Sequence, residues 1–412
     1  MRADADAHEI ERRPIAPPLY LFTGSLAGST QGFVTVTLGF VLAQRGFTSV
    51  AIAGLVGLRL LPETWRVVFG PVLDLSLTPR IWFMLSALAA AACTGLLGFL
   101  PLQSADTALL GLLALAMGIF SNICIVAQTA GIAATTAPHE RGRIAGWTSG
   151  GNLAGVGIGG GIGLWTATHV GTSVSALVIA GWCVLCAWPM LLIRTPRACS
   201  AKPLPVVARG LADEVVALAS SRRGMLTILS VTLPMGLGAF LGLLPSISGD
   251  WHASADLTAS TTGVLAGLAS VPGCLLGGAL CHRRPPQMML AASSVACALG
   301  EIMMALGPRT PLAFVLFTLL NNVLVGVSYA TVSAVVYAGL RERASGTIGA
   351  LLGSLSNVPV VAMTFTLGFV GERAGAAGMM ATEAMMGVTA ALIYGAMAWL
   401  WRPRAAEALA AA

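Results

Sequence analysis

Long apolar runs alternate with short polar segments along the whole chain. The runs are about 20 residues or longer, enough for a helix to cross a hydrocarbon layer of about 30 Å. Helices are expected because they satisfy their own backbone hydrogen bonds in lipid. The predicted spans are 19–43, 49–70, 81–101, 107–135, 144–168, 172–193, 225–247, 259–281, 287–306, 311–339, 346–370 and 376–401. The pattern therefore predicts an all-α integral membrane protein with twelve transmembrane helices.

The longest polar segment divides the predicted spans into two groups of six. The expected parts are a tail at 1–18, a six-helix half at 19–193, a central loop at 194–224, a second six-helix half at 225–401 and a tail at 402–412. The halves echo each other, because Asn122 corresponds to Asn322 and Leu61-Pro62 to Val271-Pro272. Such repeats are typical of transporters whose halves rock about a central site.

Composition supports a lipid environment. Hydrophobic residues make up 56% of the 412 residues and charged residues only 10%, whereas soluble domains carry about 25% charge. The net charge of +6 is spread over short loops, so no nucleic-acid partner is expected. Most basic residues fall in loops on one face of the membrane if both chain ends lie inside. We expect a multi-pass protein of a bacterial inner membrane, with both termini cytoplasmic, acting as a monomer.

The sequence lacks the motifs of several functional classes of protein. The chain has no G-x-x-x-x-G-K-[ST] phosphate-binding loop, so ATP is not expected to drive it. The eight cysteines lie mostly in apolar runs and do not indicate a disulfide framework. The five histidines are scattered, and no nucleophile–base constellation is visible. We expect no enzyme, no cofactor and no metal.

Three charges interrupt the second apolar run. Arg59, Glu63 and Arg66 are spaced by four and three residues, which predicts a single helical face. A charge in the middle of a bilayer costs roughly 2.5–3.5 kcal/mol, and such residues usually serve an ion or substrate path. Arginine binds carboxylate or phosphate through a forked donor set, and a glutamate shielded from water can exchange protons near neutral pH. The alternative is a structural salt bridge that fixes a helix pair.

Other polar residues lie on spans expected to line a cavity. Each alone is more simply explained as an interhelical hydrogen bond, worth about 0.6 kcal/mol on average. As a set they indicate a hydrogen-bonding cavity. With the arginines, the predicted substrate contacts are Arg59, Arg66, Gln31, Thr35, Asn122, Gln128, Asn152, Asn322, Tyr329 and Asn357. Glu63 is the first candidate for proton coupling and Glu301 the second, whereas Glu383 is expected to be solvated near a helix end.

The loop after the second span, 70–80, resembles the loop 2–3 signature of the major facilitator superfamily, G-x-x-x-D-R-x-G-R. Gly70, Asp74 and Arg80 match, while Leu75 stands where the family usually has a basic residue. The resemblance implies that Asp74 pairs with arginines at inner helix ends and latches the outward-facing state. Arg141 and Arg143 are the expected partners. The alternative is a helix-terminal charge with no switching role.

A narrower resemblance covers the first eighty residues. The segment 19–23, Leu61-Pro62, Arg66, Phe69 and 71–74 are similar to the pattern of the AmpG-like permeases. That group includes muropeptide permeases, acetyl-CoA transporters and siderophore importers. The resemblance implies proton-coupled import of a medium-sized polar or amphiphilic small molecule by alternating access, with a ferric siderophore slightly favoured over a muropeptide.

Two alternatives remain open. Gly155 to Gly160 resembles the antiporter pattern G-P-x-x-G-G, except that Val156 replaces proline. This keeps proton-antiport efflux of drugs or metabolites as a second function, although small residues also let helices pack closely in lipid. The other alternative is a membrane sensor or scaffold on the same fold that does not transport a solute. The deep charges argue against it.

Overall fold

The computed structural model describes residues 16–47, 49–100, 107–193, 204–340 and 345–401. Within these ranges the chain is helical, with no β-strand. Eight helices are long and apolar enough to cross a membrane, beginning with Leu19–Gln44. The prediction of an all-α membrane protein is confirmed, whereas the count of twelve spans stays a prediction. Most of the two predicted tails and the first part of the central loop lie outside the described residues.

The first part of the chain corresponds to the first six predicted spans. Its elements are α2 (Leu19–Gly32), η1 (Phe33–Leu38), α3 (Gly39–Gln44), α4 (Ser49–Leu60), η2 (Leu61–Glu63), η3 (Arg66–Val68), α5 (Phe69–Leu75), α6 (Pro79–Phe99), α7 (Thr107–Thr135), α8 (Arg141–Gly157), η5 (Ile158–Ile162), α9 (Gly163–His169), α10 (Thr172–Ala187) and η6 (Trp188–Leu192).

The second part follows α11, which lies in the predicted central loop. Its long final element α18 contains Gly375 at φ 65°, so it consists of two helices, as the sequence predicted. The elements are α11 (Leu204–Ser220), α12 (Arg222–Thr232), η7 (Ala239–Leu243), α13 (Leu244–Ile247), η8 (Ser248–Trp251), α14 (Ala255–Ser260), η9 (Thr261–Leu265), α15 (Ala266–Arg283), α16 (Pro286–Leu306), α17 (Pro311–Ala338) and α18 (Ser345–Leu400).

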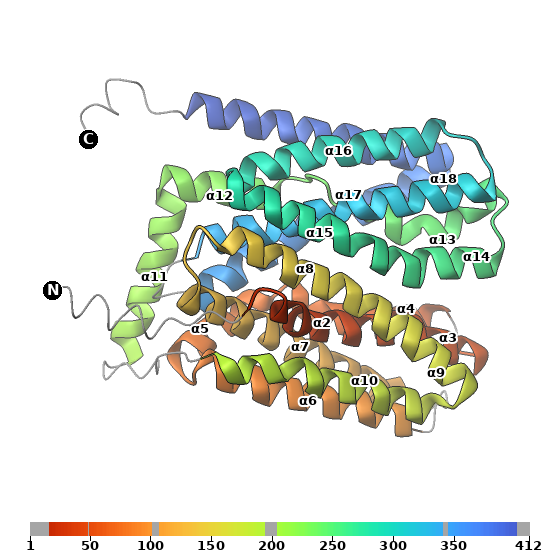
Figure 1. The fold of residues 1–412 in the computed structure, drawn as a ribbon, viewed down its shortest axis with the longest axis horizontal. Coiled ribbons are helices and arrows are strands. Elements are labelled where there is room, and N and C mark those ends of the chain that lie inside the picture. Colours follow the sequence, from red (N-terminus) through yellow and green to blue (C-terminus); the bar gives the residue numbers. More distant parts are fainter. Residues whose placement is uncertain (1–15, 48, 101–106, 194–203, 341–344, 402–412) are drawn as a thin grey trace.

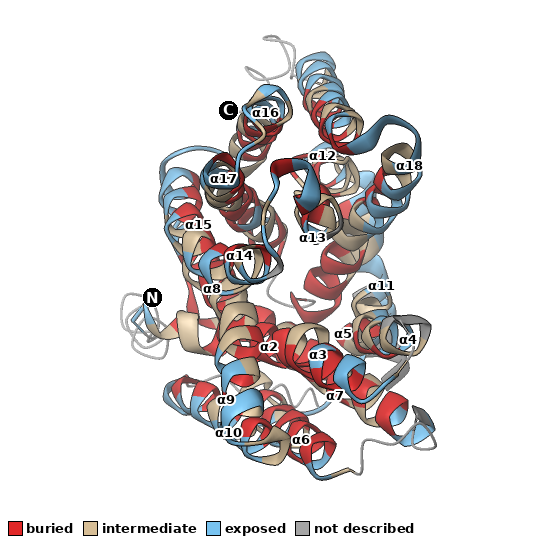
Figure 2. Ribbon diagram, turned by 90° about the vertical axis from the view of Figure 1, so that its right-hand side faces the viewer, coloured by how far each residue is buried: buried red, intermediate tan, exposed pale blue. Residues whose placement is uncertain are grey.

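The helices form an elongated bundle (Figure 1). We call the end that carries α11 and α5 the linker end, and the opposite end, with α9 and α14, the far end (Figure 1). Seen from the far end, α2, α6, α7 and α10 gather on one side and α12 to α18 on the other (Figure 2). Helix α8 packs against α2 and also against α15 and α17, so it joins the two groups.

Glycines determine how closely α8 approaches its neighbours. Gly28 of α2 faces the backbone of Asn152, and Gly155 of α8 faces the backbone of Ser25; a Cβ at either glycine would collide with a carbonyl oxygen. On the opposite face of α8, a Cβ on Gly146 would lie 2.7 Å from the carbonyl oxygen of Cys274 in α15. Small residues at four-residue spacing permit such backbone contact in lipid. The glycine run of the predicted fifth span therefore has a packing role.

Two predicted spans are not continuous helices. The run 49–70 leaves the α-helix after Leu60, and the run 225–247 leaves it after Thr232. Pro62 and Pro234 lie in these breaks, and Gly236 and Gly238 have φ of 60° and 65°. Proline removes a hydrogen bond from a helix, and a glycine in the left-handed conformation interrupts the helical path. Interrupted helices at membrane depth are tolerated where the backbone is buried in protein or lines a cavity. Both breaks line a cavity between the two groups of helices.

Candidate functional site

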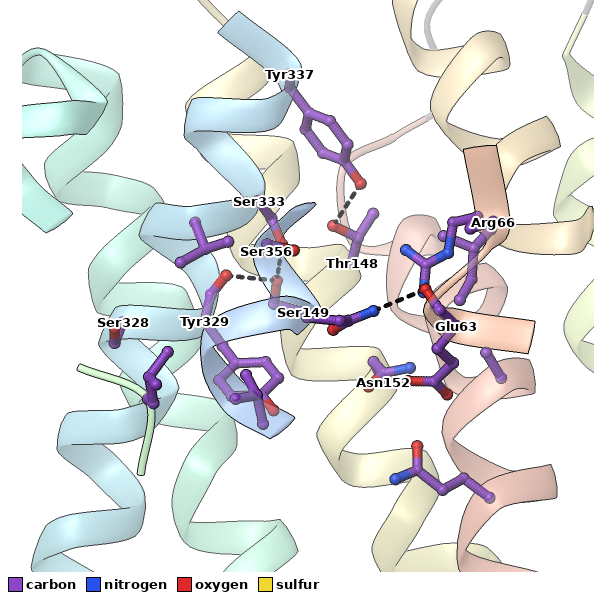
Figure 3. A pocket seen from close by; sticks show the side chains of 18 of the residues that line it. Glu63, Arg66, Thr148, Ser149, Asn152, Ser328, Tyr329, Ser333, Tyr337 and Ser356 are labelled. Atoms are coloured by element: carbon purple, nitrogen blue, oxygen red, sulfur yellow. Dashed lines mark hydrogen bonds between the residues drawn. The ribbon is translucent and has the colours of Figure 1, made fainter. Parts of the chain in front are cut away.

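A central pocket of about 230 Å³ lies between the two groups of helices. Both helix breaks contribute to its wall, through Glu63 and Arg66 on one side and 235–237 on the other. Figure 3 shows polar side chains from α8, α17 and α18 pointing into it. The pocket is lined by Gly24, Ala27, Gln31, Glu63, Arg66, Ile125, Gln128, Thr148, Ser149, Asn152, Met235, Gly236, Leu237, Ser328, Tyr329, Val332, Ser333, Tyr337, Ser356, Asn357 and Val360.

The break after α4 separates the three predicted charges. They were expected on one helical face, but Arg59 ends α4 while Glu63 and Arg66 lie in two short 3-10 turns. Arg59 is 1% exposed and does not line the pocket. Its Nη2 donates to Thr30 Oγ1 at 2.9 Å and to the Ala27 carbonyl at 3.2 Å. Arg59 therefore holds α4 against α2, behind the pocket wall.

Glu63 lies between the buried arginine and the pocket. Its Oε1 is 3.6 Å from Nη1 of Arg59, and its side chain is 24% exposed. It also attracts Arg66 electrostatically. Asn357 of α18 donates from Nδ2 to the Glu63 carbonyl at 3.1 Å, so the turn that carries Glu63 is tied to the other group of helices. The carboxylate is thus oriented by Arg59 and reached by solvent in the pocket.

Arg66 presents its guanidinium to the pocket (Figure 3). Its Nε donates to Asn122 Oδ1 at 2.8 Å, and Asn122 Nδ2 donates to the Gly118 carbonyl at 2.9 Å. Both terminal nitrogens are left without a hydrogen bond to the described residues. A Cβ on Gly353 would lie 2.9 Å from Nη1, so this glycine makes room for the arginine. The arrangement suits a forked bond to an anion.

The neutral part of the wall can form many hydrogen bonds. Gln31, Gln128, Asn152, Tyr329 and Asn357 line it, in agreement with the positions chosen from the sequence. Gln128 is held by a 2.7 Å bond from Nε2 to Thr23 Oγ1. Amide and phenol groups offer both donors and acceptors. This wall can therefore bind a solute with several polar groups.

Sequence reasoning missed several hydroxyl groups of the wall. Ser149 and Ser333 lie with their Oγ atoms 2.8 Å apart, and Tyr337 donates from its hydroxyl to Thr148 Oγ1 at 3.2 Å (Figure 3). The available signal was the four-residue spacing from Tyr329 to Ser333 to Tyr337, which places all three on one face of α17. Serine and threonine are too common in membrane helices to be singled out individually.

Three other predicted contacts lie away from the pocket wall. Thr35 of η1 donates to the Gln31 carbonyl of α2 at 2.9 Å, one turn earlier in the same span. Asn322 donates to the Thr318 carbonyl at 2.8 Å and accepts a 3.4 Å bond from Ser270, which joins α17 to α15. Asn122 lies behind Arg66 and orients it. These side chains hold the helices that form the wall.

Hydrogen bonds join the two groups of helices at the linker end of the bundle. Asp74, at the end of α5, accepts bonds from the amides of Gly346 and Thr347 at 3.0 and 2.7 Å and from the Thr347 hydroxyl at 2.8 Å. Arg141 donates to the carbonyls of Tyr337 and Leu340 at 3.1 and 3.3 Å. The acidic and basic members of the predicted latch thus bind different partners.

Arg143, the third member of the predicted latch, has an exposed side chain. Among the described residues, Asp74 therefore bonds to the start of α18 and not to an arginine. A carboxylate is favoured at that position because the first amides of a helix have no partner within the helix.

The two remaining buried acids do not line the central pocket. Glu301 on α16 is 2% exposed and Glu383 on α18 is 4% exposed. The expectation that Glu383 is solvated was wrong, because the second helix of α18 packs this residue against the break after α12. Its carboxylate accepts bonds from the Ala239 and Phe240 amides at 2.7 and 2.8 Å.

Comparison with known proteins identifies the class. The family model of the Major Facilitator Superfamily matches residues 20–364. The chain belongs to this superfamily of membrane transporters, which points to a transporter rather than an enzyme. No curated protein matches the chain in sequence.

Solved structures with the same fold include members of that superfamily. The human organic anion transporter MFSD10 (TETRAN) has a TM-score of 0.69 at 18% identity, covering 93% of this chain and 100% of that one. The proton:xylose symporter XylE, bound to 6-bromo-6-deoxy-D-glucose, has a TM-score of 0.69 at 14% identity, covering 93% and 95%. FucP in the outward conformation has a TM-score of 0.67 at 14% identity, covering 92% and 99%. At these identities the likeness shows the fold alone.

Proposed function

We propose that this protein is a secondary active transporter that imports an anionic small molecule together with protons. One observation carries the proposal: the guanidinium of Arg66 and the carboxylate of Glu63 face the same central pocket. The neighbours named as an organic anion transporter and a proton symporter have activities compatible with this pair of charges.

The charges suggest how proton and substrate are coupled. While Glu63 is ionised, it attracts Arg66 and competes with an anionic solute. A proton on Glu63 removes this competition, so the arginine can bind the substrate anion. Arg59 stays hydrogen-bonded to α2 behind the pocket wall and takes no direct part in binding the solute. Proton and substrate therefore bind together, which is the requirement for symport.

The linker-end contacts supply the conformational part of the proposal. With Asp74 bound to the start of α18, the pocket is shut toward the linker end and would open toward the far end. Breaking these bonds and those of Arg141 would reverse access. We assign the linker end and both termini to the cytoplasm of a bacterium, with twelve helices in two six-helix halves crossing its inner membrane as a monomer. The basic residues of the predicted inner loops support this orientation.

The narrower assignment is to the AmpG-like permeases, with a ferric siderophore favoured over a muropeptide. Ligand pockets usually measure about 300–1,000 Å³, so the present 230 Å³ must widen to hold such a solute. A rocking motion that opens the far end would provide the extra volume. The wall of amides and hydroxyls fits a solute rich in oxygen atoms.

Uptake into proteoliposomes tests the function. A panel of ferric siderophores and anhydro-muropeptides is offered under an inward proton gradient to wild type, Glu63→Gln and the matched control Glu372→Gln, whose side chain is exposed. We expect gradient-driven uptake by wild type and control, and its loss with retained binding in Glu63→Gln. Accumulation only under the reversed gradient would establish efflux instead. Uptake that survives Glu63→Gln would move coupling elsewhere in the chain.

A further inference from the structure

The second group of helices contains a pair of buried carboxyls that the pocket does not use. Glu301 of α16 and Glu383 of α18 are 2% and 4% exposed, and Glu383 acts electrostatically on Glu301. Within the described part of the chain, neither lies within ion-pair distance of a basic side chain. The thiol of Cys297 is the third titratable group in this cluster. Helices α16 and α18 pack against each other, and two carboxylates that repel each other in a place shielded from water cannot both be ionised at low cost.

The two acids differ in how their oxygens are satisfied. Both oxygens of Glu383 accept amide hydrogen bonds, from Ala239 at 2.7 Å and from Phe240 at 2.8 Å. An ionised carboxylate is suited to accepting two amide bonds. Glu301 is different, because its buried Oε2 has no hydrogen-bond partner among the described residues. A buried charged acceptor without a donor is costly, and a proton on the carboxyl would remove the charge and turn one oxygen into a donor.

A neighbouring amide has the same deficiency. Asn321 of α17 donates to the carbonyls of Phe317 and Gly300, the residue before Glu301, but its own Oδ1 has no donor. The cluster therefore has an excess of acceptors over donors, and a proton would redress it. We infer that Glu301 and Glu383 form a second proton-binding site in which Glu301 holds the proton and Glu383 remains ionised.

The position of this site connects it to the central pocket. Glu383 binds the amides of residues 239 and 240, while Met235, Gly236 and Leu237 of the same break form part of the pocket wall. The path from carboxylate to pocket is thus a few residues of irregular backbone. If Glu383 took up a proton, it would lose acceptor capacity and release the start of η7. A substrate that contacts the pocket wall and a proton that binds the carboxyl pair would both act on the break between α12 and η7. Such a shared element is what coupling between two sites requires.

This inference deepens the proposed function by adding a proton site outside the pocket, but its test does not need a substrate. Purified protein in lipid is studied by infrared spectroscopy at neutral pH. We expect a carboxylic-acid C=O band in wild type, its loss in Glu301→Gln, and no change in the exposed control Glu372→Gln. A band that persists in Glu301→Gln assigns the proton to another residue and overturns the inference.

Two further readouts keep the test decisive. Wild type alone must show the band, so its absence at neutral pH overturns the inference even if Glu301→Gln fails to fold. Stabilisation of wild type by Na⁺ with no such band would assign the pair to a metal ion instead.

Hydrogen exchange of peptides covering 239–243 should be about tenfold faster in Glu383→Gln, because a neutral amide has one acceptor where the carboxylate has two. Unchanged exchange there would break the link to η7. Absent transport with these results intact would count against the proposed function only.

Discussion

The two acidic sites of this protein have opposite surroundings. Glu63 lies at a pocket, is 24% exposed and has the guanidinium of Arg59 3.6 Å away. Glu301 and Glu383 lie in the other group of helices, are nearly inaccessible to water and have each other in place of a base. Both sites nevertheless adjoin a break in a predicted transmembrane helix.

The difference shows that the partner, more than burial itself, decides what a membrane carboxyl does. The carboxylate of Glu63 has a guanidinium as its partner and faces a cavity that a substrate could enter. Beside another carboxyl, one member is driven to hold a proton. Polar side chains occur at both helix breaks because the backbone amides and carbonyls that a break frees need hydrogen-bond partners.

The largest effect on stability is expected when Glu63 loses the basic side chain beside it. Arg59→Met leaves Glu63 without its partner and the Thr30 hydroxyl without its donor. Losing one member of a buried ion pair costs about 3–5 kcal/mol, and partial exposure of Glu63 favours the lower figure. Thermal unfolding of purified protein measures this loss. Arg59→Met combined with Glu63→Gln should recover part of it; an additive double variant would show that the two residues are not coupled.

Substrate affinity should respond most to Arg66. Arg66→Gln removes the charge but keeps a donor, and we expect affinity for an anionic solute to fall by about 2 kcal/mol or more, roughly thirtyfold, because charge-assisted forked bonds are lost. Equilibrium binding of the siderophore and muropeptide panel provides the measurement. Arg66→Lys is the control, since it retains charge without the fork. Equal affinity in wild type and Arg66→Gln would exclude an anion-binding role.

The linker-end closure should depend on Asp74. Asp74→Asn replaces one carboxylate oxygen by a donor that faces the amides of 346–347, so closure should weaken by about 1.5–3 kcal/mol, the range for hydrogen bonds to charged groups. Spin labels on the linker ends of α5 and α18 report the distance distribution. We expect a new population at longer distance. Glu372→Gln, whose side chain is exposed, serves as the control. A distribution unchanged from wild type would support a helix-terminal charge without a switching role.

The smallest effect is expected at the second acidic site. Because Glu301 already holds a proton in our inference, Glu301→Gln exchanges one neutral side chain for another and should change stability by less than about 1 kcal/mol. Glu383→Gln should cost more, since it weakens two amide bonds. Thermal unfolding of both variants gives the order. The reverse order would place the negative charge on Glu301.

Many residues of the pocket wall could be predicted because polar side chains stand out within apolar runs of the sequence. Gln31, Gln128, Asn152, Tyr329 and Asn357 are polar residues in apolar runs, and all five line the pocket. Arg59 looked the same in sequence as Arg66, yet it lies behind the wall. No pattern of spacing could separate them, because the turn at Leu61 to Arg66 rotates one arginine away from the other.

The sequence by itself determined the membrane class, the helical elements and the presence of deep charges, because hydropathy and the cost of burying charge act locally along the chain. Only the tertiary structure decided which charges meet. It placed Asp74 against the start of α18, turned Arg59 toward α2, and brought Glu383 to a backbone 144 residues away in sequence. These are long-range pairings, set by the close approach of glycine-lined helices and by backbone groups that broken helices leave to be satisfied by distant side chains.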